Sequence, residues 1–240
     1  MFDIIHVIIY LLLAGALALS VILARKFRAG ALNILFVSYA FGVFFLALSQ
    51  LFDYLVGNGT YVLADVSFHL WLHLIMYCSL LAFIWGGYRV KKSIDSVQAA
   101  SSSGLSGTDK TVFASLTILA GAFFVLPPIL EPAFSVSLPG SAIDLFGLHH
   151  FLVFVGAFVV GWYLFRIKGS WGLLGQGIAF MVAFLVLIGG LHLWEVVTES
   201  QSLQLFDLPE TIVEGVELFF LLPAVLAFIV GQWRIFKFVR

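Results

Sequence analysis

Long runs of apolar residues, separated by short polar stretches, dominate this chain. Each run holds about 20 residues or more, which is enough for a helix to cross a hydrocarbon core about 30 Å thick. The runs lack the alternation of apolar and polar positions that a membrane-spanning β-strand needs, and they are about twice the length of such a strand. The pattern therefore predicts an all-α, polytopic membrane protein, a bundle of seven transmembrane helices near residues 3–24, 31–56, 66–88, 111–130, 143–165, 172–197 and 210–233.

Composition points the same way, because 62% of the residues are hydrophobic, only 10% are charged, and the mean hydropathy is +1.12. These values lie far outside the range of soluble globular domains. The first apolar run has no basic residue before it and is followed by RKFR, so we expect an uncleaved span rather than a signal peptide. The single cysteine, Cys78, cannot form an internal disulfide.

The chain shows no soluble domain, no internal repeat and no nucleic-acid-binding motif. We therefore predict one seven-helix transmembrane domain over residues 1–240. Residues 93–109 are rich in Ser and Gly, which is typical of a flexible connection, here a cytoplasmic loop. The expected partners are membrane lipids and other membrane proteins, while the oligomeric state stays open.

Basic residues indicate the orientation of the bundle, because Lys and Arg gather in the short connections on the cytoplasmic side. All twelve basic residues of this chain fall on one side of the predicted bundle: Arg25, Lys26, Arg28, Arg89, Lys91, Lys92, Lys110, Arg166, Lys168, Arg234, Lys237 and Arg240. The pattern predicts a cell-membrane protein whose N-terminus lies outside and whose C-terminus lies in the cytoplasm.

All six histidines fall in the opposite, extracytoplasmic half of the helices. A rise of 1.5 Å per residue gives their approximate depth. His73, His149, His150, His192 and Glu217 come out roughly 8 to 11 Å below the outer boundary, and His69, Asp53, Glu195 and Glu214 roughly 5 Å below it. His6 is set apart, since interfacial packing suits a histidine at a helix start. The others form a polar layer within the membrane.

Spacing turns this layer into a candidate site, because ionisable groups in hydrocarbon are costly without a partner. His69 and His73 are separated by four positions, and His192 and Glu195 by three, so each pair shares one face of a helix. His149 and His150 point about 100° apart, so only one of them is expected to face the centre.

Imidazoles combined with carboxylates are the ligands that Zn, Fe and Cu prefer, and a divalent cation would neutralise the acids. The number of ligands allows either one metal with outer carboxylates or a dinuclear site, and the spacing resembles, in reverse order, the Glu-x-x-His helices of di-iron bundles. Glu195 and Glu214 are the candidate catalytic bases. The predicted metal ligands are His69, His73, His149, His150, His192, Glu195, Glu214, Glu217 and Asp53.

Four classes of function remain open at this point. The leading hypothesis is an integral membrane metalloenzyme, either an oxidoreductase or a hydrolase. A b-type cytochrome is the first alternative, with haem b held by His73 and His192 or by His149 and His192. A transporter of metal ions or protons is the second, and a sensor or assembly subunit is the third. A metal-free hydrogen-bonded network would also satisfy the polar layer.

Overall fold

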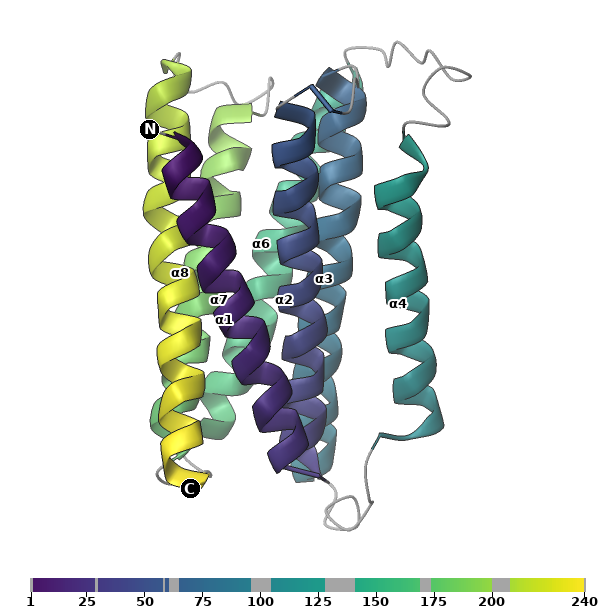
Figure 1. The fold of residues 1–240 in the computed structure, drawn as a ribbon, viewed down its shortest axis with the longest axis vertical. Helices are drawn as coiled ribbons and strands as arrows, with labels where there is room; N and C mark the ends of the chain where they lie inside the picture. Colours follow the sequence, from purple (N-terminus) through teal and green to yellow (C-terminus); the bar gives the residue numbers. More distant parts are fainter. Residues whose placement is uncertain are drawn as a thin grey trace. The chain divides into compact units, whose positions relative to one another are not determined.

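The fold was analysed in a computed structural model of the chain, which describes residues 2–28, 30–57, 59–60, 65–95, 105–127, 141–168, 174–199 and 208–239. Within these ranges the regular elements are helices, as the apolar runs predict. Figure 1 shows them in chain order: α1 (Phe2–Lys26), α2 (Ala31–Gly57), α3 (Asp65–Asp95), α4 (Gly107–Val125), α6 (Ser141–Ile167), α7 (Leu174–Glu199) and α8 (Glu210–Val239).

Six of these helices are long and apolar enough to cross a membrane, and the part of α6 from His150 to Arg166 forms a shorter apolar stretch. Helices suit a hydrocarbon environment because every backbone N–H and C=O group within them is paired internally. Over the described residues, the prediction of an all-helical protein with the character of a multi-pass membrane protein is thus confirmed, with seven helices of which six are suited to crossing a membrane. The sidedness of the termini stays a prediction.

The predicted 93–109 loop differs from the structure at both of its ends. Helix α3 continues to Asp95, and α4 already begins at Gly107, so the ends of the predicted 93–109 loop are helical. The prediction was wrong there because polar residues at a helix end look the same as a polar connection. Residues 96–104, the middle of that segment, lie outside the described part of the chain.

Two compact units divide the chain, one formed by residues 1–23 and 139–240 and the other by residues 24–138. We call them unit 1, with most of α1 and with α6, α7 and α8, and unit 2, with α2, α3 and α4. The packing within either unit does not test the prediction of one domain over residues 1–240. Each unit is therefore described by itself.

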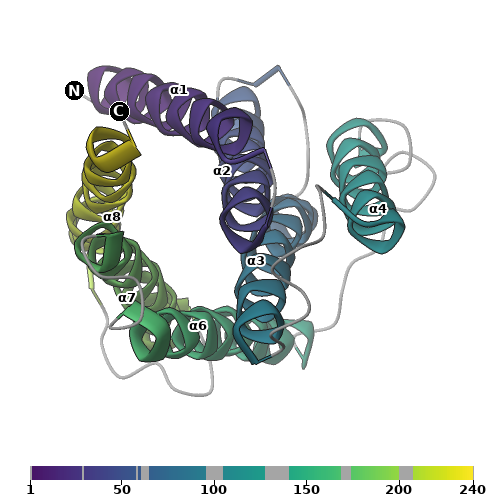
Figure 2. The same ribbon diagram turned by 90° about the horizontal axis from the view of Figure 1, so that it is seen from below.

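In unit 1, α7 lies between α6 and α8, as the end-on view in Figure 2 shows. Glycines permit its close approach to α8. A Cβ atom at Gly177 would lie 2.7 Å from the carbonyl oxygen of Gly231, and a Cβ atom at Gly231 would lie 2.7 Å from the carbonyl oxygen of Gly177. Small residues at helix contacts let backbones approach, and this is how membrane helices gain packing energy without a hydrophobic driving force.

A buried polar pair joins α1 to α8. The amide Nε2 of Gln232 donates to Ser20 Oγ, which itself donates to the carbonyl oxygen of Ala16 at 2.9 Å. Both Ser20 and Gln232 are fully buried. A hydrogen bond of this kind between membrane helices contributes about 0.6 kcal/mol on average.

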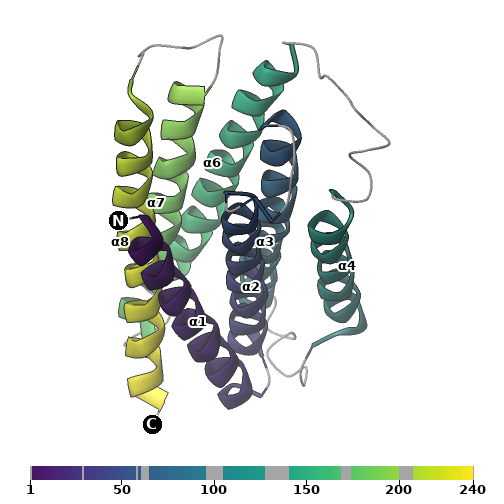
Figure 3. The ribbon, with the colours of Figure 1, turned by 45° about the horizontal axis from the view of Figure 1, so that its top comes forward.

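In unit 2, α2 and α3 lie side by side along their length (Figure 3). A Cβ atom at Gly86 would lie 2.5 Å from the Cβ atom of Ser38, so this position requires glycine. Seven positions before Gly86 in α3, Ser79 Oγ donates to the carbonyl oxygen of Gly42 in α2 at 2.7 Å. Small residues again set the spacing of the two helices.

Helix α4 packs on α2 and α3 largely through aromatic and small apolar side chains. Phe41 and Phe113 stack with ring centroids 4.7 Å apart. A buried cluster continues this contact and consists of Phe45, Cys78, Ala82, Leu116 and Ala120.

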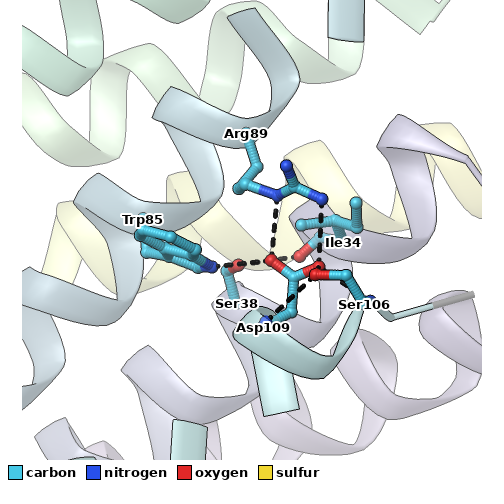
Figure 4. A network of polar contacts seen from close by, with 6 residues as sticks. All are labelled: Ile34, Ser38, Trp85, Arg89, Ser106 and Asp109. Atoms are coloured by element: carbon cyan, nitrogen blue, oxygen red, sulfur yellow. Dashed lines mark hydrogen bonds and ion pairs between the residues drawn. The ribbon is translucent and has the colours of Figure 1, made fainter. Parts of the chain in front are cut away.

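Asp109, in the first turn of α4, is fully buried and is the centre of a polar network (Figure 4). It accepts hydrogen bonds from Trp85 Nε1 at 3.0 Å, from Arg89 Nη2 at 3.0 Å and from Ser106 Oγ at 2.6 Å. Arg89 Nε also lies 2.9 Å from a carboxylate oxygen. Ser106 caps α4 in a capping box with Asp109. The network fastens the start of α4 to the end of α3.

Candidate metal centre

The candidate site of unit 1 lies where α6 and α7 meet and consists of His150, His192 and Glu195. Helix α6 carries His150, and α7 carries His192 and Glu195 three positions apart, which places the latter two on one face. The adjacent packing of α6 and α7 brings the second imidazole to that face.

One carboxylate oxygen is shared by both imidazoles. Glu195 Oε2 lies 2.7 Å from His150 Nδ1 and in still closer hydrogen-bonding contact with His192 Nδ1. The two Nδ1 atoms are 3.3 Å apart. The rings are inclined by 31° with centroids 5.6 Å apart, so they converge on the carboxylate rather than stack on each other. Three ligand-type atoms thus surround one point.

Burial of these polar side chains is unfavourable unless they form hydrogen bonds with one another. The side chains of His150 and His192 are each 1% exposed, and that of Glu195 is 12% exposed. An ionised carboxylate in such surroundings needs hydrogen-bond donors or a counter-charge, because transfer from water costs several kcal/mol. Each Nδ1–H provides a donor, so the metal-free site is internally paired through Glu195 Oε2.

Glycines next to the site allow α7 to lie close to both of its neighbouring helices. A Cβ atom at Gly189 would already touch Ala157 Cβ and Phe154 of α6, both at 3.6 Å. A Cβ atom at Gly190 would lie 2.8 Å from a ring carbon of Phe220 in α8. The pair therefore holds α7 close to both neighbours just one turn before His192.

One of the three separations between ligand atoms already fits a tetrahedral metal ion. Metal–nitrogen bonds of about 2.0–2.1 Å place neighbouring ligand atoms about 3.3 Å apart in a tetrahedral site, which is the observed separation of the two Nδ1 atoms. The separation of 2.7 Å between Glu195 Oε2 and His150 Nδ1 is that of a hydrogen bond. An entering cation would replace the imidazole protons, and the Glu195 oxygen would have to move away from both Nδ1 atoms to become a ligand.

Among the other predicted ligands, His73 is a buried residue of α3 in unit 2. Asp53 of α2 and Glu217 of α8 are half-buried. The backbones of His69, His149 and Glu214 belong to α3, α6 and α8, while their side chains lie outside the described part of the structure. Among the predicted ligands with described side chains, unit 1 joins His150, His192 and Glu195 directly.

The sequence reading overlooked the other buried acid, Asp109, which it assigned to a cytoplasmic loop. The signal was present in the chain: Ser106 and Asp109 are three positions apart before an apolar run, which is the spacing of a capping box. The partner Arg89, 20 positions earlier, has no comparable local signal.

In comparisons with known proteins, no protein family, curated protein or solved structure matches the chain.

Proposed function

We propose that this protein is an integral membrane metal-binding protein that holds one transition-metal ion between His150, His192 and Glu195. The observation that carries the proposal is the convergence of two Nδ1 atoms, 3.3 Å apart, on one carboxylate oxygen inside a buried site. Two imidazoles and a carboxylate favour Zn, Fe or Cu over Mg or Ca, which prefer oxygen ligands. One point of convergence supports one ion rather than two.

We further propose, from the sequence, that His73 is a metal ligand. Support comes from the sequence, which predicts His73 at the depth of His150 and His192, and from the burial of its side chain. A tetrahedral ion held by His150, His192 and Glu195 alone would keep one position open to water or substrate, whereas a fourth protein ligand would close the site. A closed site suits storage, transport or structure, and an open one suits a hydrolase or oxidoreductase.

The proposed location is the cell membrane, with the site nearer the extracytoplasmic side. The positions of all twelve basic residues support this orientation. In the open form of the site, Glu195 would serve as a ligand, and Glu214 remains a candidate base for activating a bound water.

Metal content of the purified full-length protein tests the proposal. We expect about one equivalent of Zn, Fe or Cu per chain in the wild type, and a clear loss of it in His192→Ala, because that substitution removes one of two nitrogen ligands. His6→Ala, which removes an imidazole predicted to lie at the interface, should leave the metal content unchanged. Equal metal content in all three proteins, or none in the wild type, would sink the proposal.

The second candidate is a metal-free site that stores a proton on a transport route. It is favoured by the contacts of Glu195 with both imidazoles, which have hydrogen-bond lengths rather than the separation of metal ligands. Proton flux in liposomes together with absence of bound metal would support this candidate instead. Haem, with His73 and His192 or His149 and His192 as its predicted ligands, gains no support from the contacts of this site, in which His192 Nδ1 contacts Glu195.

A further inference from the structure

One end of unit 1 carries a group of basic side chains without acidic neighbours. This end is formed by the C-terminal ends of α6 and α8 and by the start of α7. We call its basic residues the basic end: Arg166, Lys168, Arg234 and Lys237. Among the described residues none of the four forms an ion pair with a carboxylate, because the acidic residues in the helices of unit 1 lie toward the opposite ends of these helices.

Each basic side chain lies over an aromatic ring. Lys168 Nζ is 3.9 Å from the ring centroid of Phe165, Arg166 Cζ is 5.6 Å from that of Trp162, and Lys237 Nζ is 5.8 Å from that of Trp233. Trp162 and Trp233 are 55% and 45% exposed. Exposed tryptophans near basic residues are typical of the level of lipid headgroups.

Arg234 is the most firmly placed member of the basic end. Its Nη1 donates to Gln176 Oε1 of α7 at 2.9 Å, and its Cζ lies 5.0 Å from the ring centroid of Phe180. A guanidinium group has five N–H donors, so this contact leaves others available for an acceptor. Its planar arrangement of donors matches a phosphate group with two parallel hydrogen bonds.

In unit 2, by contrast, a basic side chain is neutralised by a carboxylate of the chain itself. There Arg89 is neutralised by the buried carboxylate of Asp109. The basic end of unit 1 has no such carboxylate among its described residues, which leaves its positive charges available to anions outside the chain. At the predicted cytoplasmic surface of a membrane, the abundant anions are the phosphates of anionic phospholipids.

We propose that the basic end binds the headgroup phosphate of an anionic phospholipid, with Arg234 as the central donor and Lys168, Lys237 and Arg166 around it. The aromatic rings hold the aliphatic stems and cations at headgroup level, so that the donors face the lipid phosphate. This site is independent of the proposed metal site, which lies at the other end of α6 and α7.

Native mass spectrometry of the full-length protein with added phosphatidylglycerol or phosphatidylcholine tests this proposal. We expect the wild type to bind phosphatidylglycerol at least about fivefold better, the factor that one basic residue near an anionic surface contributes. The variant Lys168→Gln/Arg234→Gln/Lys237→Gln should lose this preference. The control Arg28→Gln/Lys110→Gln, with two exposed basic residues of unit 2 replaced, should retain it.

Two further arms keep the outcome decisive. Arg234→Lys preserves the charge but not the paired donors, so its preference should fall between those of the wild type and the triple variant, with unchanged helical content by circular dichroism. Inorganic phosphate at millimolar concentration should not displace the lipid. Equal binding of the two lipids, an unchanged preference in the triple variant, or displacement by phosphate alone would overturn the proposal.

Discussion

At Glu195, a single carboxylate oxygen is contacted by two buried imidazoles. This arrangement has two chemically related states. In one, two Nδ1–H groups donate to the carboxylate, and in the other a cation takes the place of those protons. The buried surroundings favour either state over an unpaired carboxylate, because an uncompensated charge there is costly. The same three side chains can therefore be stable without metal and still be ready to bind it.

The charge of Glu195 is predicted to determine metal affinity. Glu195→Gln keeps the size of the side chain and a carbonyl acceptor but removes the negative charge. We expect the metal dissociation constant to rise by about 100-fold or more, because even loss of an outer-sphere partner costs about 10–100-fold. Isothermal titration calorimetry with Zn²⁺ measures this change in the dissociation constant.

The matched control is Glu199→Gln, which removes a carboxylate one turn further along α7. Its affinity for Zn²⁺ should remain that of the wild type. Similar weakening in the two variants would mean that general electrostatic attraction, rather than ligation by Glu195, governs the affinity.

At the scale of helices, the site depends on how closely α6 and α7 approach. Periodicity alone placed His192 and Glu195 on one face, and their contact confirms that part of the reasoning. Which of His149 and His150 faces α7 depends on the rotation of α6 about its axis, and therefore on the packing of α6 against α7, where Phe154 and Ala157 lie next to Gly189. No local pattern in the sequence encodes that rotation, so the sequence could narrow the ligand to the pair but not choose His150.

For the same reason, the sequence could not predict contacts between side chains that lie far apart along the chain. Ser106 and Asp109 show a local capping pattern, but Arg89 and Trp85 reach the carboxylate only because α3 and α4 pack side by side. The fold class could be predicted because apolar run length is a property of each helix by itself. Contacts between helices depend on the shapes of both partners.

The network around Asp109 is predicted to hold α4 in place. Asp109→Asn leaves the Arg89 guanidinium in the α3–α4 contact without its carboxylate, and we expect a loss of about 3 kcal/mol in the free energy of unfolding. Ser106→Ala removes only the cap and should cost about 1 kcal/mol. Reversible unfolding in detergent, followed by circular dichroism, gives both values.

Adding Arg89→Gln to Asp109→Asn supplies the control. Because the double variant no longer contains an uncompensated guanidinium, it should recover part of the stability lost in Asp109→Asn. If the two substitutions instead add without coupling, the ion pair does not hold α4 to α3.

At the scale of the whole molecule, seven apolar runs and a one-sided distribution of basic residues predict that the C-terminus lies in the cytoplasm. Reporter fusions in a bacterial host test it: green fluorescent protein at the C-terminus should fluoresce, and alkaline phosphatase at the same position should be inactive. Replacing Arg234 and Lys237 by Gln should leave this result unchanged, since ten other basic residues still mark the cytoplasmic side. Active phosphatase at the C-terminus would contradict the prediction and show that the C-terminus lies outside.

X-ray absorption at the metal edge tests the central claim most directly, because it reports the atoms bound to the ion in the full-length protein. We expect a first shell of nitrogen and oxygen atoms at about 2.0–2.1 Å, with the multiple-scattering signature of at least two imidazoles, and loss of one imidazole in His192→Ala loaded with excess metal. A shell of oxygen atoms alone, unchanged in His192→Ala, would contradict it.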